Sequence, residues 1–438
     1  MAQFRKDTHK YLPQETTLFE TVMLADQYGN LVGAANPSGM AVDAFGRARM
    51  STPLTLFDSS HRYRDNGLWV QANNTNTTVT FSPSEGLINL SVSTAANDQI
   101  IRETTKVFSY QPGKSLQVLN TFVMANAQTN LIQRVGYYGA NNGIYLEQAN
   151  GSIYLVERTS SSGSMTENRV AQADWNIDTL LGAVDSSPSQ KTLDLSKAQI
   201  LFTDIEWLGL GTVRCGFVID GQLIHCHSFH HANRISTTYM TTASLPLRYE
   251  INNVGPTGNS STLKQVCSTV ISEGGYELRG FQQSIGTAIK TPRNLPTSGV
   301  DYAVATLRLK DARKDAIVIL TALSVMGIGN NGKFLWKVIR NGTLSNTTFT
   351  SAGTDSSVEY NTVANNVVTG GITMAQGYFS SDTQSSVPTD ILKEALFKFQ
   401  LERDSLSGTA GYPLTLAVAG GTDNLDVHGS MDWDEISR

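Results

Sequence analysis

Two acidic residues separated by one position are the first candidates for chemistry in this sequence. Asp204 and Glu206 stand in the run Gln199-Ile-Leu-Phe-Thr-Asp-Ile-Glu-Trp207, whose apolar and β-branched residues predict a strand. Residues two apart on a strand point to the same face, so we expect the two carboxylates about 6–7 Å apart. That separation is compatible with the paired carboxylates that cleave glycosidic bonds.

Other features of the sequence weigh against catalysis. Jelly-roll glucanases carry three acids on one strand in an acid-x-acid-x-acid pattern, whereas Phe202 and Leu208 occupy the flanking positions here. A solvent-facing pair or an inter-strand ion pair is the preferred interpretation of Asp204 and Glu206. The G-x-S-x-G elbow and the G-x-x-x-x-G-K-[ST] loop are absent, and no helix pattern follows the glycine-rich run 327–332, which we interpret as a loop. We therefore expect no catalytic residue, no cofactor and no enzyme activity.

Four histidines form the tightest group of potential metal ligands: His225, His227, His230 and His231. A His-x-His pair on a strand points two imidazoles the same way, which suits Zn²⁺. The expected neighbour Arg214 repels a cation, and no carboxylate is close in the sequence. Local packing or subunit contacts are the preferred interpretation. Whether His225 and His227 bind a metal stays open, and we assign no metal site.

Two further features bear on ligand binding. The segment Tyr110-Gln-Pro-Gly-Lys-Ser115 contains Pro-Gly, which fits a type II turn, and its lysine would be able to contact a phosphate or sulfate. A plain turn is the preferred interpretation of that segment. Four aromatic side chains offer rings on which a sugar can stack, although such rings more often belong to a core: Tyr137, Tyr138, Tyr145 and Trp207.

A predicted hairpin positions the histidines beside the acidic pair. Asp220-Gly221 separates two alternating runs, which is the strongest short-range signal for a two-residue hairpin turn. The register that follows from this turn places Cys215 opposite Cys226. One face, expected to join the core, carries Val213, Cys215, Phe217, Ile224 and Cys226. The other face carries Arg214, Val218, Leu223, His225 and His227.

The three cysteines cannot form a disulfide framework. Pairing across the hairpin would bring the sulfurs of Cys215 and Cys226 close together, and whether they ever form a disulfide stays open. Buried, reduced cysteines that act as small hydrophobic residues are the preferred interpretation. Cys267 has no evident partner, and the set fits assembly in a reducing cytoplasm.

Composition limits the partners of the chain. Its 438 residues carry a net charge of −5, with only 16% charged residues, so there is no basic surplus to bind nucleic acid. The polar start Met-Ala-Gln-Phe-Arg-Lys-Asp predicts no signal peptide. The longest apolar stretch, residues 316–325, is far shorter than the roughly 20 residues that span a bilayer. We expect a soluble protein with no nucleic-acid partner and no membrane insertion.

The pattern of strands and turns predicts an all-β protein. The 37 glycines and 12 prolines fit a loop-rich β structure, and strand signals follow one another from about residue 71 onward. We expect two jelly-roll or lectin-like β-sandwich domains, at 71–288 and 289–438, preceded by an extended N-terminal docking arm at 1–70. Asn150-Gly151 predicts a second hairpin turn. The one helix candidate begins near Pro388-Thr389-Asp390.

Several blocks of this sequence, taken together, resemble one family of tailed-bacteriophage virion proteins common in marine viruses. They occur in order over roughly residues 43–280. The blocks are Phe45-Gly-Arg, Thr55-Leu-Phe-Asp58, Tyr110-Gln-Pro-Gly-Lys-Ser115, Arg134-Val-Gly-Tyr137, Asn141-Asn-Gly-Ile144, Asp204 to Phe229, Leu245-Pro-Leu-Arg-Tyr-Glu-Ile251 and Cys267-Ser-Thr-Val-Ile-Ser-Glu-Gly-Gly275. Proteins of this kind are usually described only as structural, tail-fibre or baseplate-like.

The resemblance implies a non-enzymatic virion structural protein that is assembled in the host cytoplasm. We expect a tail fibre or a baseplate or neck appendage subunit that contributes to assembly and host adsorption. Its partners would be other virion proteins, further copies of itself in a homotrimer, and a glycan of the host surface. One alternative is a capsid-surface decoration or head-fibre protein. Another is a carbohydrate-binding or polysaccharide-cleaving sandwich on the virion.

Overall fold

The computed structural model describes residues 24–25, 31–32, 52–277, 279–329, 331–381, 398–406 and 411–437. Within these ranges the regular elements are strands, apart from two short 3₁₀ helices, η1 (Gln172–Asp174) and η2 (Asp311–Arg313). The strands pair antiparallel, so the predicted all-β class is confirmed. No helix of the described part is long and apolar enough to cross a membrane. Residues 53–438 form one compact unit, and residues 1–52 form another.

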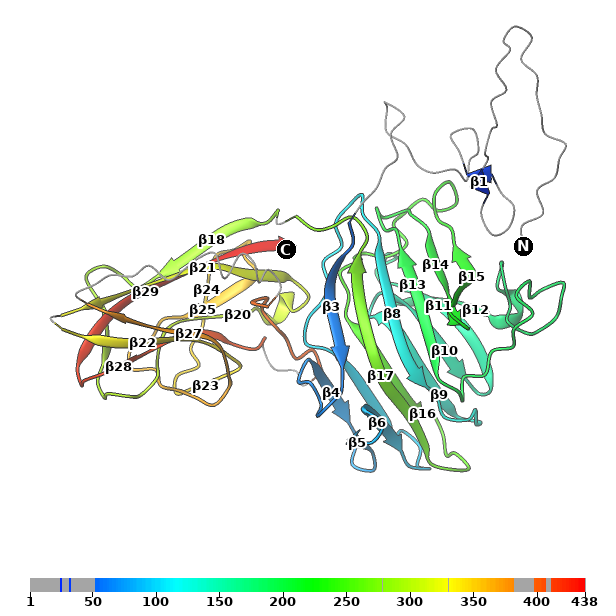
Figure 1. Ribbon diagram of the computed structural model, residues 1–438, viewed down its shortest axis with the longest axis horizontal. Helices are drawn as coiled ribbons and strands as arrows, with labels where there is room; N and C mark the ends of the chain where they lie inside the picture. Colours follow the sequence, from blue (N-terminus) through cyan, green and yellow to red (C-terminus); the bar gives the residue numbers. More distant parts are fainter. Residues whose placement is uncertain are drawn as a thin grey trace, which may run out of the picture. The chain divides into compact units, whose positions relative to one another are not determined.

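Two sheets of the first sandwich hold most of residues 54–272 (Figure 1). The larger sheet runs in the order β15-β14-β13-β8-β17-β6-β5, and β3 also pairs with β17. Its strands are β3 (Leu54–Ser60), β5 (Thr78–Ser82), β6 (Leu87–Val92), β8 (Leu116–Val123), β13 (Gln199–Ile205), β14 (Val213–Ile219), β15 (Gln222–Phe229) and β17 (Ser261–Ser272). The other sheet contains β12 (Thr166–Ala171), β11 (Ser152–Thr159), β10 (Gly143–Ala149), β9 (Leu131–Tyr138), β16 (Leu247–Asn253), β7 (Gln99–Thr104) and β4 (Trp69–Asn73), in that order.

The core of the first sandwich lies between these two sheets and follows from alternation along the strands. In β8 the side chains alternate strictly between buried and partly exposed, and Leu116, Val118 and Phe122 face inward. Strand β16 of the opposite sheet contributes Tyr249 and Ile251 to the same apolar cluster. Every second side chain of the strands in both sheets therefore points inward, and these side chains form one shared core.

The second sandwich is built in the same manner from residues 281–437. Its four-stranded sheet contains β18 (Phe281–Gly286), β29 (Leu425–Ser437), β19 (Arg293–Leu295) and β21 (Ile317–Ile328). Its six-stranded sheet contains β24 (Thr350–Ser351), β25 (Val358–Asn361), β20 (Tyr302–Leu309), β28 (Leu414–Gly420), β22 (Lys333–Arg340) and β27 (Ile372–Ser380). Two short pairs complete the strands: β23 (Thr343–Leu344) with β26 (Val368–Thr369), and β1 (Leu24–Ala25) with β2 (Leu31–Val32) in the N-terminal unit.

Several strands begin or end away from the predicted boundaries. Strand β3 and the start of β4 fall inside the segment expected as an arm, and β3 pairs with β17 of the first sandwich. Strand β12 pairs with Tyr154 to Thr159 of β11. Of the loop expected at 327–332, Gly327 and Ile328 belong to β21, and the connection to β22 begins at Gly329. The predicted helix near Pro388 and most of the arm lie outside the described residues.

Both predicted hairpin turns are confirmed. Ala149 pairs with Ser152 across Asn150-Gly151, and Ile219 pairs with Gln222 across Asp220-Gly221. The turn residues Asn150 and Asp220 have positive φ values of 51° and 52°, as a two-residue hairpin turn of this type requires.

A β-bulge changes the register of the second hairpin beyond Gly216. Gly216 pairs with His225 as predicted, but Cys215 pairs with His227. The predicted Cys215–Cys226 pair is therefore wrong, because Cys226 is the extra residue of the bulge. All five residues of the predicted core face are nevertheless buried.

Gly216 leaves space on the outer face of this hairpin for the ring of Phe202. A Cβ atom at Gly216 would lie 2.0 Å from the Ile224 carbonyl oxygen and 2.6 Å from Phe202 Cε1. We predict that Gly216→Ala lowers the free energy of unfolding by about 2–4 kcal/mol, because backbone as well as ring must move. Urea denaturation measures this.

Gly258→Ala is the matched control, because a Cβ there would meet only Gln128 Oε1, at 3.5 Å. Its stability should stay within about 0.5 kcal/mol of the wild type. Equal stability of the two variants would show that the ring of Phe202 does not need the space at Gly216.

Candidate functional site

Four strands of the larger sheet of the first sandwich begin or end at one level. Leu116, the first residue of β8, pairs with both Ile205 at the end of β13 and Ser272 at the end of β17. Ile205 also pairs with Val213, the first residue of β14. The residues just beyond this line are Ser115, Glu206, Thr212 and Glu273. The strand register therefore brings segments that are far apart in sequence to one place.

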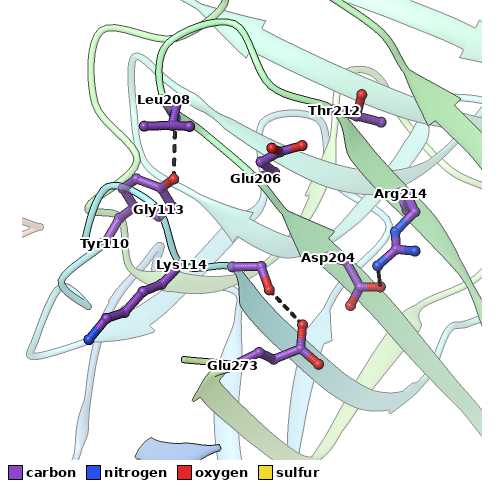
Figure 2. A pocket seen from close by; sticks show the side chains of 10 residues that line it. Tyr110, Gly113, Lys114, Asp204, Glu206, Leu208, Thr212, Arg214 and Glu273 are labelled. Carbon is purple, nitrogen blue, oxygen red and sulfur yellow. Dashed lines mark hydrogen bonds and ion pairs between the residues drawn. The ribbon is translucent and has the colours of Figure 1, made fainter. Parts of the chain in front are cut away.

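A pocket of about 450 Å³ lies at this place (Figure 2). It is lined by Tyr110, Gly113, Lys114, Ser115, Asp204, Glu206, Leu208, Thr212, Arg214 and Glu273. Its lining is rich in carboxylates and hydroxyls, and the half-exposed Leu208 adds an apolar edge. Such a volume is in the range of small-molecule sites, which span about 300–1,000 Å³.

Internal contacts hold the walls of the pocket. Arg214 Nη2 lies 3.1 Å from Asp204 Oδ2 (Figure 2). Ser115 donates a 2.7 Å hydrogen bond to Glu273 Oε2. Asp204 and Arg214 are directly opposed on β13 and β14. The inter-strand ion pair preferred for Asp204 is thus confirmed.

Asp204 is the buried acid of the pocket. Burial raises the pKa of its carboxyl, Arg214 lowers that pKa, and Glu273 raises it again, with a net increase above the ordinary value. Its Oδ1 is buried and has no hydrogen-bond partner among the described residues. By contrast, Glu206 is exposed. The predicted acid pair thus reaches one pocket, in two different environments.

The loop 206–212 forms one wall of the pocket, and Tyr239 and His231 bind its backbone carbonyls. Tyr239 donates its amide N–H to the Gly209 carbonyl and its hydroxyl to the Glu206 carbonyl. His231 lies flat on the Tyr239 ring, with 3.9 Å between ring centroids. The two nitrogens of His231 contact the Gly211 carbonyl and, at 2.7 Å, Glu157 Oε2. A doubly protonated imidazole donates to both partners when Glu157 is ionised, and this state fits the geometry.

The bulge separates the histidines that were expected to share a face. His225 contacts Ser228 Oγ at 3.0 Å on the outer face. His227 is paired with Cys215 and packs against the Phe229 ring on the core face, so the prediction that it points the same way as His225 is wrong. Burial, with His225 and His230 nearby, lowers the pKa of His227 to about 4. Among the described residues, no group of three or more histidine, cysteine or acidic side chains is placed to hold a metal ion.

Three of the four aromatic residues considered as stacking platforms are buried. Tyr137, Tyr138 and Tyr145 have no exposed surface, so they do not offer a face to a ligand. Trp207 is partly buried and packs edge-on against Tyr110, with 5.8 Å between ring centroids. These rings therefore belong to the packed interior and do not provide a surface on which a sugar can stack.

The two hairpin cysteines are free and buried, as the preferred interpretation expected, while the free Cys267 is partly exposed. Burial raises the pKa of both the Cys215 and the Cys226 thiol, so neither is poised as a thiolate.

Sequence reasoning missed Glu273 and Glu157. Glu273 enters the pocket because β17 ends beside β8, and Glu157 meets His231 from β11 of the other sheet. Both contacts join residues more than 70 positions apart, so they cannot be predicted from a local sequence pattern. Glu273 lies in block 267–275, one of the blocks that resemble the virion family, and this was the one sequence feature that pointed to it.

No protein-family model matches this chain, and no curated protein matches it. Solved structures match about half of it. A Bacillus licheniformis β-glucanase is 14% identical, covers 49% of this chain and 97% of its own, and has a TM-score of 0.33. A carbohydrate esterase from the Shiga toxin-encoding bacteriophage phi24B is 10% identical, with 51% and 100% coverage and a TM-score of 0.30. Peanut lectin is 10% identical, with 51% and 98% coverage and a TM-score of 0.28. Similarities at this level support no inference about the chain.

The ion pair behind the pocket loop predicts a pH dependence of stability. Burial lowers the pKa of His231, but the hydrogen bonds to Glu157 and to the Gly211 carbonyl outweigh burial and Arg234, so the net pKa is raised. A raised folded-state pKa stabilises the fold fully below about pH 6.5, and this contribution is lost as the pH rises through the folded pKa. We predict that the wild type exceeds Glu157→Gln in stability at about pH 6, and that the difference shrinks by about pH 9.

Urea denaturation at several pH values measures the difference. Glu85→Gln is the control, because it removes an exposed carboxylate that pairs with Lys264 and not with a histidine. A difference between wild type and Glu157→Gln that stays constant with pH would rule out a charged His231.

Proposed function

We propose that this protein is a non-enzymatic structural subunit of a tailed-bacteriophage virion. In this proposal it belongs to a tail fibre or to a baseplate or neck appendage, forms a homotrimer, and contributes to assembly and host adsorption. The pocket of the first sandwich contacts a glycan of the host surface. Residues 1–52 form the docking segment that joins the subunit to other virion proteins.

One observation carries the proposal. Every residue that lines the pocket belongs to one of three blocks that resemble the virion family, namely 110–115, 204–229 and 267–275. These blocks are separated by about 90 and 40 residues in the sequence, yet strand pairing brings them together. The resemblance therefore coincides with one site on the surface of the molecule, which is where a recognition function would be located.

The pocket has features that suit recognition of a glycan. Asp204, Arg214 and Thr212 lie on or beside strands, so their positions are set by the sheet rather than by a free loop. Charged and hydroxyl side chains at fixed positions pair with sugar hydroxyls through directional hydrogen bonds. Because Arg214 already holds one oxygen of Asp204, the pocket is better arranged to accept hydrogen bonds than to transfer protons.

One observation favours cleavage of a polysaccharide as a second candidate. Burial raises the pKa of Asp204, which is the direction that favours a general acid, and Glu206 is a second carboxylate in the same pocket. The ion pair with Arg214 and the absence of a third acid on the strand weigh against this candidate.

Cryo-electron microscopy of the assembled particle tests the proposed function. We predict density for this chain at the tail, baseplate or neck. Density over the capsid lattice would instead support a decoration or head-fibre protein, and absence from the particle would contradict a structural role.

The same preparation tests the docking segment with a chain that lacks residues 1–52. This deletion leaves the compact unit 53–438 whole, whereas deletion to residue 70 would remove β3. The shortened chain should fold but not enter particles.

Release of reducing sugar from host polysaccharide separates binding from cleavage. We predict none above background for the wild type, and no change for the variant that combines Asp204→Asn with Glu206→Gln, because neither carboxylate acts in catalysis. Activity in the wild type that is lost in the double variant would establish the cleaving alternative.

A further inference from the structure

We infer that the pocket selects a sugar that carries a free amino group over acidic or N-acetylated sugars; this inference rests on the proposed glycan contact. The pocket holds three carboxylates, from Asp204, Glu206 and Glu273, and two cations, from Lys114 and Arg214. Two positive and three negative groups give its lining a formal charge of −1. A ligand with its own negative charge adds to that excess.

The two cations of the pocket already have partners. Arg214 Nη2 is engaged by Asp204, and Lys114 Nζ donates a 2.9 Å hydrogen bond to Gln111 Oε1. Figure 2 shows the ammonium end of Lys114 pointing away from Asp204 and Glu206. A carboxylate or sulfate on the ligand would therefore meet an Arg214 whose charge Asp204 already offsets.

The acceptors of the pocket are open by comparison. Asp204 is 9% exposed, and its Oδ1 is buried without a hydrogen-bond partner in the described part of the chain. The Glu206 carboxylate makes no hydrogen bond or ion pair with any described residue. The exposed Glu206 carboxylate is therefore the acceptor that a ligand in the pocket can reach. An ammonium group brings three N–H donors and a positive charge.

The outer face of the other sheet offers a contrast, because its carboxylates are matched by arginines. On the outer face of that sheet, Arg134 bridges Glu147 and Glu250, at 2.6 and 2.8 Å. Arg158 meets Glu167 at 2.7 Å. There each of these carboxylates has a guanidinium partner, whereas the pocket leaves Glu206 unmatched.

Binding to three trisaccharides of equal length tests the inference on the full chain. The probes are a trimer of glucosamine, the same trimer with every amine acetylated, and a trimer of galacturonate, measured by calorimetry at neutral pH and low salt. We expect the glucosamine trimer to bind and the acetylated trimer to bind about tenfold more weakly, because a charge-assisted hydrogen bond is lost. The galacturonate trimer should show no saturable binding.

Glu206→Gln should weaken binding of the glucosamine trimer about tenfold, because it removes the free charge while keeping the side-chain shape. Since Glu206 is exposed, the variant should fold as the wild type does. Asp185→Asn is the matched control, because it removes one exposed carboxylate of the same sandwich away from the pocket, and it should bind as the wild type does.

The outcomes separate this inference from the proposed function. Equal binding of the acetylated and free-amine trimers, or tighter binding of the galacturonate trimer, overturns the inference and leaves a glycan contact in place. Equal effects of Glu206→Gln and Asp185→Asn overturn it as well, since the attraction would then be one of net charge only. If none of the three sugars binds, both the inference and the glycan contact fail, while the place of the chain in the virion is still decided by microscopy.

Discussion

The site depends on the register in which β8 lies between β13 and β17. Leu116 is opposite both Ile205 and Ser272, so the strands stop at one line and their following residues meet. Side chains alternate with a period of two along each strand, and a slip of one residue in β13 would turn Asp204 into the core. The buried residues on the inner face of β8 and β13 prevent such a slip, because the slip would expose Leu201 and Ile205. Core packing therefore fixes the pocket geometry.

Charge is treated differently on the two sheets of the first sandwich. The outer face of the seven-stranded sheet neutralises its charges internally, and Arg158 also covers the rings of Tyr138 and Tyr145. Buried charges that are paired and hydrogen-bonded in this way contribute to a defined arrangement, and a missing partner would be costly. The pocket on the eight-stranded sheet keeps acceptors without donors. That imbalance distinguishes the pocket from the outer face of the seven-stranded sheet, and the proposed recognition role rests on it.

Contacts inside the compact unit also join its two sandwiches. Arg403 donates a 2.7 Å hydrogen bond to Glu103 Oε1, and both side chains are only 3% exposed. Val107 of the first sandwich packs with Ile317 and Ile319 of β21. These partners are some 200–300 positions apart in sequence, and the local pattern of neither segment predicts the contact.

The sequence by itself determined the all-β class, the two hairpin turns and the inward face of β14, because these follow from alternation and from turn residues that tolerate positive φ. It also identified Asp204 and Glu206 as neighbours on one strand and Lys114 as a separate candidate. Only the tertiary structure decided that Glu273 joins them, that His227 turns to the core, and that Tyr137, Tyr138 and Tyr145 are buried. The bulge inserts one residue without a sequence signal that distinguishes Cys226 from its neighbours. Pairing between distant strands is set by the summed packing of both sheets, a quantity that no local stretch of residues contains.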